Sequence, residues 1–281
     1  MSNLLNLTRK AVPCGELVPN LLDAIVLGLI QGIAEWLPIS STGHLRLYEY
    51  FRGLKVPLLY DITLHMGTLA VILVFFRKDI KRILSALVHL DFKTEHGRLI
   101  PLIIVGSVPT ALIGYVFRKT VESIFLGPLP IGIALSLCGV LLVSSRMAHE
   151  KTDQISYLTA IVFGIAQGVS IIPGLSRSGT TIAVALLLGL KRERAFRFSF
   201  LLSIPAIIGA EALTAYDQRA ALAQSGFGML EIAVGVAVTT ITGYFALKLL
   251  HNAIENRKFH LFAFYCWLFG LFLVMLGLSG F

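Results

Sequence analysis

The chain has few charged residues and few cysteines. Only 14% of its 281 residues are charged, whereas 56% are hydrophobic and the mean hydropathy is +0.81. A water-soluble fold of this length would leave too much apolar surface in contact with water. The composition therefore predicts an all-α polytopic membrane protein.

The sequence gives no sign of a cysteine-based metal or redox site, and residues 1–20 do not resemble a cleaved signal peptide. Cys14, Cys138 and Cys266 are far apart and lack the spacing of a metal site, and the last two lie in apolar segments, where cysteine behaves as a small hydrophobic residue. Residues 1–20 have neither the apolar core nor the cleavage site of a signal peptide. We therefore expect the first membrane helix to direct insertion itself.

The basic residues do not form one continuous stripe. The formal net charge is +8, but the Lys and Arg residues lie between apolar segments, which is typical of loops at a membrane surface. A protein that binds nucleic acid would gather them on one face. We therefore expect a membrane lipid environment and no nucleic-acid partner.

One nine-residue pattern occurs twice. Ala24–Gly32 reads AIVLGLIQG and Ala160–Gly168 reads AIVFGIAQG. Each copy runs into a polar stretch broken by Pro and Gly, the first loop (Leu37–His44, LPISSTGH) and the second loop (Pro173–Thr181, PGLSRSGTT). Helices break inside a bilayer only where protein or a water-filled cavity satisfies the freed backbone groups. The paired breaks therefore predict one central cavity.

The remaining apolar segments predict six membrane spans. A span needs roughly 20 apolar residues, and the repeated segments, residues 21–36 and 157–172, end too early, so we expect two re-entrant helix–loop–helix pairs. The six predicted spans are Leu58–Phe76, Leu99–Phe117, Leu129–Val143, Phe198–Leu213, Met229–Leu247 and Phe259–Leu278.

These elements predict a single integral membrane domain, residues 1–281, built from two repeats. Repeat one covers about 21–117 and repeat two about 157–250, and the spans at 129–143 and 259–278 complete the bundle. A second match supports the register, since Thr110–Lys119 reads TALIGYVFRK and Thr239–Lys248 reads TTITGYFALK. Each half contains three spans, an odd number, so the two repeats must have inverted topology.

Loop charges predict the orientation. Arg77–Arg98 contains six basic residues, whereas its counterpart, Thr214–Gly228, contains only Arg219. Basic loops stay in the cytoplasm. We therefore expect a multi-pass plasma membrane protein with both termini outside, and with the two loops meeting near the midplane in a site open to the extracytoplasmic side.

The first loop has the residue types of a catalytic site. Gln31 and Glu35 are four residues apart and share one helical face, and Ser40, Ser41 and His44 follow. A carboxylate within a bilayer indicates function, and a hydroxyl, an imidazole and a carboxylate together suit nucleophilic catalysis. The alternatives are an interfacial Glu35, a serine helix cap and a structural His44.

The second loop has the residue types of an anion site. Arg177 lies among Ser176, Ser178 and Gly179, next to Thr181, where we expect a short helix over Thr180–Leu190. Helix N-terminal N–H groups and a guanidinium converge naturally on phosphate. The alternative is an Arg177 that pairs with Glu35 for structure. The loop is not a nucleotide-binding GxxxxGK[ST] sequence, so no ATP site is expected.

The segments QGIAEWLPISSTGH and PGLSRSGTT together resemble the undecaprenyl-diphosphatase family of bacitracin-resistance proteins, and the resemblance covers almost the whole chain. It implies a membrane enzyme that removes the terminal phosphate of a C55 polyprenyl diphosphate and regenerates the monophosphate carrier of cell-wall glycans. In that reading Ser41 is the nucleophile, His44 takes its proton, Glu35 orients His44 or a metal, and Arg177 with Thr181 binds phosphate. His44 as the nucleophile remains an alternative.

The resemblance also implies a divalent cation, Mg²⁺ or Ca²⁺, at the family's (E/Q)xxxE element. This element is Gln31 and Glu35 here, with Gln31 where many members have Glu. An amide binds a cation less well than a carboxylate. The cation is therefore expected to rest mainly on Glu35 and on the substrate's diphosphate.

Three further expectations carry less sequence support. Phe75, Phe76, Phe196, Phe198 and Phe200 either line an opening for the prenyl tail or are packing residues, which is the commoner case. Small residues, Gly132, Ala134 and Gly139, permit close helix packing and hence a homodimer. The rival function is a secondary transporter or a polyprenyl-phosphate flippase, because inverted repeats with broken helices are common in transporters.

Overall fold

The computed structural model describes residues 20–279 except 55, 57, 126, 218 and 220–227, so Cys14 lies outside the described residues. This part of the chain is helical and has no β-strand. Its helices are α1 (Leu21–Trp36), α2 (Ser41–Arg52), α3 (Leu58–Phe75), α4 (Arg77–Val88), α5 (Leu99–Ile124), α6 (Pro128–Ser144), η1 (Ser145–Met147), α7 (Tyr157–Val169), α8 (Arg177–Leu187), α9 (Arg192–Asp217), α11 (Met229–Glu255), η2 (Phe259–Leu261) and α12 (Phe262–Leu278).

Six helical segments are long and apolar enough to span a membrane, as predicted. They correspond to α3, α5, α6 with η1, α9, α11 and η2 with α12. Only 22% to 44% of their apolar windows is buried inside the protein. The rest of this apolar surface faces outward, which suits contact with lipid rather than water.

Four shorter helices hold the two loops. α1 and α2 flank the first loop and α7 and α8 flank the second, with lengths of 16, 12, 13 and 11 residues. The second loop turns at Gly174, whose φ is +101°, a conformation that glycine adopts without strain. α8 begins at Arg177, three residues before the predicted start, so Arg177 lies in its first turn. The re-entrant path and the inverted repeat stay predictions.

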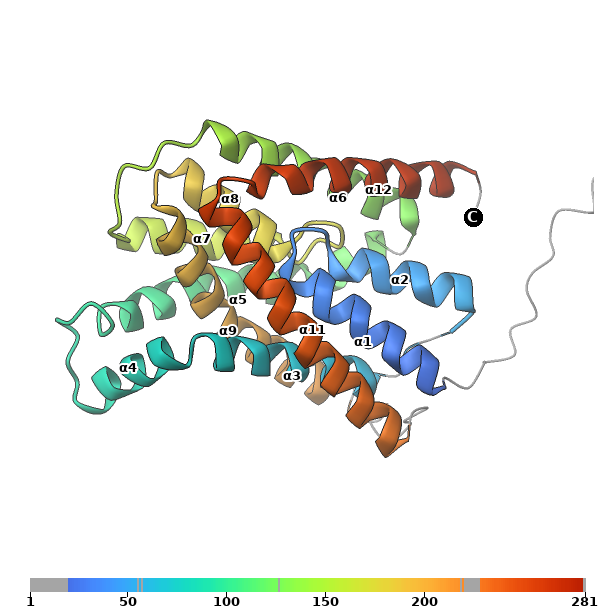
Figure 1. Ribbon diagram of the computed structural model, residues 1–281, viewed down its shortest axis with the longest axis horizontal. Coiled ribbons are helices and arrows are strands. Elements are labelled where there is room, and N and C mark those ends of the chain that lie inside the picture. Colours follow the sequence, from blue (N-terminus) through green and yellow to red (C-terminus); the bar gives the residue numbers. More distant parts are fainter. Residues whose placement is uncertain are drawn as a thin grey trace, which may run out of the picture.

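Each short helix that leads into a loop packs on a span from the other half of the chain. α1 packs against α11, and α7 against α5 (Figure 1). The contacts are close enough to require glycine, because a Cβ at Gly28 would lie 2.8 Å from the Gly235 carbonyl oxygen and one at Gly164 would lie 2.0 Å from that of Gly106. The two repeated segments therefore anchor the two halves to each other.

The small residues of α6 face α12 of the same chain. A Cβ at Gly132 would lie 2.6 Å from the Gly270 carbonyl oxygen, and one at Gly139 would lie 2.6 Å from Trp267 Nε1. In Figure 1, α6 and α12 run side by side, and α2 lies between this pair and α1. This face of α6 is thus covered by α12 of the same chain. The homodimer stays a prediction, and its interface would have to lie on a different surface.

The basic loop after α3 contains α4 and is tied to the beginning of α9. Arg194 NH1 lies 2.5 Å from Glu95 Oε1, and Arg197 pairs with Asp79. Side chains from α4, from the segment before α5 and from α9 therefore form one ionic cluster at the end of the bundle where α5 and α9 begin.

Candidate active site

Glu35 is the residue on which the two loops converge. Ser41 Oγ donates to its Oε2 at 2.9 Å, and Gln31 Nε2 donates to the same oxygen at 3.2 Å. From the other half of the chain, Arg177 NH2 donates to Oε1 at 2.5 Å. The structure thus joins four of the predicted site residues through one carboxylate.

The surroundings of Glu35 keep it ionised. Burial raises the pKa of this carboxyl, but Arg177, His65 and the Ser41 hydroxyl together bring its pKa below the ordinary value. Arg177 also lies over the Trp36 ring, 5.5 Å from the ring centre, a cation–π arrangement. The ion pair between Arg177 and Glu35, given above as the alternative to an anion site, is present, and its guanidinium belongs to the first turn of α8.

Ser40 leaves the N-terminus of α2 open. Its φ is +67°, a strained conformation for a residue other than glycine, and its side chain does not cap the helix. Instead, Ser40 Oγ accepts a hydrogen bond from Gly174 N at 3.2 Å. The first-turn N–H groups of α2 are therefore not satisfied by a serine cap, and they lie beside Ser41, where an anion would be stabilised.

His44 does not contact Ser41 in the way the sequence suggested. Its Nδ1 lies 2.8 Å from the Ser40 carbonyl oxygen, and its Nε2 lies 2.6 Å from Tyr265 Oη. Burial lowers the pKa of His44. The Ser41 proton points to Glu35 rather than to an imidazole, so the arrangement differs from the predicted Ser–His–Glu relay.

The other hydroxyl residues of the second loop form hydrogen bonds with the backbone of α8 and α1. Ser176 Oγ accepts from Gly179 N at 3.2 Å, Ser178 Oγ donates to the Trp36 carbonyl oxygen at 2.8 Å, and Thr181 Oγ1 donates to the Arg177 carbonyl oxygen at 2.8 Å. All three hydroxyl residues are buried. Their predicted phosphate contacts stay predictions.

A divalent cation would find few protein ligands at this site. Both oxygens of Glu35 accept hydrogen bonds, and Gln31 Oε1 is buried without a partner in the described chain. Within the described residues, no group of three or more His, Cys, Asp and Glu side chains could hold a metal ion. Gln31 Oε1 and Glu35 fit a cation that draws its remaining oxygen ligands from a bound diphosphate and water, a mode common for Mg²⁺.

Sequence reasoning missed a polar cluster within two spans. His65 Nδ1 on α3 lies 3.8 Å from Asp61 Oδ1 and 3.7 Å from Glu211 Oε1 on α9. The available signal was the presence of ionisable residues inside apolar spans, which are costly there. Tyr265 was also missed, because a tyrosine in an apolar span reads as an ordinary interfacial residue.

The phenylalanines considered for a tail opening are core residues. Phe76, Phe196, Phe198 and Phe200 are at most 5% exposed and pack in the main hydrophobic core, and Phe75 is partly buried against it. The packing interpretation is therefore confirmed for these side chains.

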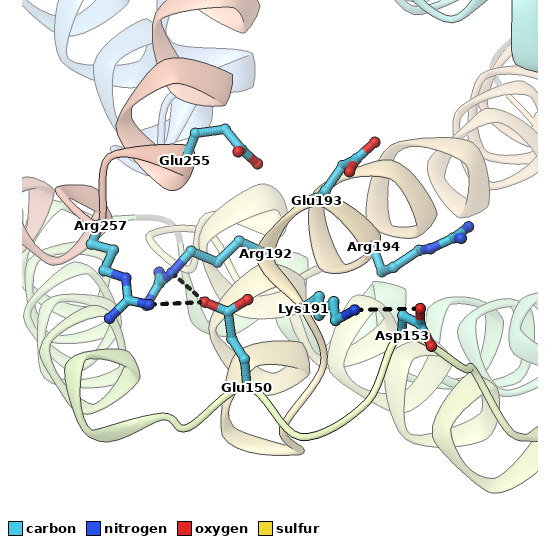
Figure 2. Close-up of a pocket in the computed structure, with 8 residues that line it drawn as sticks. All are labelled: Glu150, Asp153, Lys191, Arg192, Glu193, Arg194, Glu255 and Arg257. Atoms are coloured by element: carbon cyan, nitrogen blue, oxygen red, sulfur yellow. Dashed lines mark hydrogen bonds and ion pairs between the residues drawn. The ribbon is translucent and has the colours of Figure 1, made fainter.

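The charged side chains of a pocket away from the two loops pair with one another. Arg192 Nε and Arg257 NH2 lie 3.2 and 3.6 Å from Glu150 Oε1, and Lys191 Nζ lies 3.5 Å from Asp153 Oδ2 (Figure 2). Its other lining residues are Glu193, Arg194 and Glu255. Acidic and basic groups are equally represented, so this pocket does not have the character of a phosphate site.

Comparisons with known proteins agree with the motif. The family model for "Bacitracin resistance protein BacA" matches residues 24–272. A protein named undecaprenyl-diphosphatase from Carboxydothermus hydrogenoformans is 40% identical, covering 93% of this chain and 99% of its own. Proteins of the same name from Desulforapulum autotrophicum and Methanosphaera stadtmanae are 42% and 41% identical, each covering 92% of this chain and 98% of its own. A family model that matches most of the chain, together with such relatives, places this protein in the BacA bacitracin-resistance family.

Proposed function

We propose that this chain is a membrane undecaprenyl-diphosphate phosphatase whose chemistry takes place where the two loops meet. The family match, the names of its relatives and the six apolar helices support the activity and the lipid substrate. The observation that carries the location is Glu35, which binds the Ser41 hydroxyl and the Arg177 guanidinium at the same time. Removal of the terminal phosphate regenerates the lipid monophosphate carrier.

In the first step, Ser41 attacks the terminal phosphorus. The Oγ–P bond forms as the bond from phosphorus to the bridging oxygen breaks, and the lipid monophosphate leaves. The hydroxyl proton passes to Glu35 Oε2, its partner at 2.9 Å. Arg177 and the open N–H groups of α2 neutralise charge on the phosphoryl oxygens, which is the main demand of phosphoryl transfer.

In the second step, water attacks the phosphoserine. The water oxygen bonds to phosphorus as the Ser41 Oγ–P bond breaks, and the proton held by Glu35 returns to Oγ. One water proton stays on the released phosphate, and the other goes to His44, whose Nε2 carries no proton in the neutral ring. When a divalent cation is bound by Glu35, Gln31 and the diphosphate, it supplies further charge neutralisation.

The orientation in the membrane is part of the proposal. Basic residues cluster at the end of the bundle where α4 lies and where α9 begins, and such clusters stay cytoplasmic. This charge distribution supports the orientation with both termini outside, and the proposal adds a plasma membrane location, inverted repeats and a site that opens to the extracytoplasmic side. A homodimer is compatible with these features.

The test is phosphate release from purified protein in detergent, with farnesyl and long-chain polyprenyl diphosphates. We expect Ser41→Ala and Arg177→Ala each to abolish most turnover while Arg219→Ala, a basic residue outside both loops, leaves it unchanged. Full activity of folded Ser41→Ala would remove Ser41 as nucleophile and favour His44. Lipid diphosphate binding without release by the unaltered protein would favour the transporter or flippase alternative.

A further inference from the structure

His44 connects the first loop to the last span. The imidazole on α2 reaches Tyr265 of α12, with 2.6 Å between Nε2 and Oη, and it stacks on Phe269 with ring centres 4.1 Å apart and planes at 17°. These residues are 221 positions apart in the chain. The family motifs contain His44 but do not include any residue of α12.

The hydrogen bonds of His44 define its proton positions. The Ser40 carbonyl oxygen only accepts, so Nδ1, 2.8 Å away, carries a proton. In the neutral ring Nε2 then has no proton and accepts one from the Tyr265 hydroxyl. The hydroxyl can accept from a protonated Nε2 only after it turns its own proton away, so the contact as it stands favours the neutral ring.

The charges around His44 come from few groups. Glu35 on α1 and Arg177 on α8 are paired with each other, and α6 and α12 contain no Asp, Glu, Lys or Arg. On its own helix, the nearest charged residue in sequence is Arg46, which is exposed. Burial favours the neutral imidazole. The Tyr265 hydroxyl is therefore the polar side-chain group in direct contact with the basic nitrogen.

We propose that Tyr265 is a positioning residue that acts through His44. Its hydroxyl and the Phe269 ring fix the orientation of the imidazole on α2, and its hydrogen bond to Nε2 favours the unprotonated nitrogen that the proposed hydrolysis step requires. α12 thereby sets the pH range in which the phosphoserine is hydrolysed. This inference rests on the proposed phosphatase function.

The first test is kinetic and uses Tyr265→Phe, which removes one oxygen and keeps the ring stack. We expect kcat to fall roughly tenfold or more, as for loss of a group that assists proton transfer, while KM stays within about twofold, since no substrate contact is removed. The acid limb of the pH profile should move to higher pH, because Nε2 without a donor is more basic. Tyr115→Phe on the exposed face of α5 is the matched control.

The second test does not require activity. NMR titration of labelled histidines, with His44 assigned from His44→Gln, measures the His44 pKa directly, and Tyr265→Phe should raise it by about half a unit or more. A fluorinated tyrosine at position 265 is a stronger donor that preserves the fold, and it should lower this pKa. Unchanged His44 titration in both variants would overturn the proposal even if phosphatase activity is found. The expected shifts in a protein without phosphatase activity would support the contact and reject the proposed function alone.

Discussion

Thr239 Oγ1 donates a hydrogen bond to the main-chain carbonyl oxygen of Gly28 across 3.1 Å. Thr110 makes the corresponding bond to Gly164 at 2.9 Å. The two threonines occupy matching positions in TALIGYVFRK and TTITGYFALK, and the two glycines match in the nine-residue repeat. Each half of the chain therefore supplies the threonine that fixes the short helix of the other half, and α1 of that pair carries Glu35.

Thr239→Val should therefore weaken both the fold and the site. The substitution keeps the shape and removes a buried donor, which should lower the free energy of unfolding by about 0.5–2 kcal/mol. Thr110→Val should cost a similar amount, and the double variant should lose more activity than either single variant because both loops lose their anchors. Thermal unfolding in detergent measures the change.

Thr63→Val is the control, because it loses only a bond within its own helix. Equal losses of stability in Thr63→Val, Thr110→Val and Thr239→Val would contradict the role of the two threonines in joining the halves of the chain.

Much of the site could be predicted because it is local. Gln31, Glu35 and Ser41 lie within eleven positions, and a helical face followed by a break brings them together. The contact with Arg177 followed from the repeat, since paired breaks in two halves favour one cavity.

The partner of His44 could not be predicted. Nothing in the sequence of α12 distinguishes Tyr265 from the other aromatic residues of an apolar span. The contacts of Ser178 and Thr181 with other helices could not be predicted for the same reason, because these hydroxyls meet the Trp36 carbonyl oxygen and Ser199 only after the second loop packs on α1 and α9.

Gly174→Ala should disrupt the meeting of the loops without touching a catalytic group. Its φ of +101° is strained for alanine, and the added Cβ would lie 2.4 Å from the Ile131 carbonyl oxygen. We expect a loss of about 1–3 kcal/mol in the free energy of unfolding and a fall in kcat, because Gly174 N also binds Ser40. Gly209→Ala is the matched control, since a Cβ there meets open space within a helix, and it should raise stability by about 0.5–1 kcal/mol. Wild-type stability and activity of Gly174→Ala would show that the second loop tolerates another path.

The cluster of His65 and Glu211 should behave as an ion pair inside the membrane. Their side chains are 24% and 15% exposed, so the pair is partly buried, and removing one partner leaves an uncompensated charge at a cost that should stay below the about 3–5 kcal/mol of a fully buried pair. His65→Leu should be more damaging than Glu211→Leu, because it deprives both Asp61 and Glu211 of their partner, whereas His65 without Glu211 keeps Asp61. The double variant should recover part of the loss. A double-mutant cycle from unfolding in detergent gives the coupling, and additive losses would mean that the two side chains are not paired.

Gln31→Glu should change the dependence on divalent cations. The candidate cation ligands are the oxygens of Glu35 and Gln31 Oε1. Both Glu35 oxygens already accept hydrogen bonds, whereas Gln31 Oε1 has no partner within the described chain. We therefore expect weak cation binding before substrate arrives, and phosphate release that chelator abolishes and added Mg²⁺ or Ca²⁺ restores. A second carboxylate at position 31 would add a stronger ligand, so the cation concentration for half-maximal activity should fall several-fold. Gln154→Glu, on an exposed loop, controls for the added charge. Activity of Gln31→Glu that is unchanged by cation or chelator would mean that Arg177 and the α2 N-terminus neutralise the diphosphate unaided.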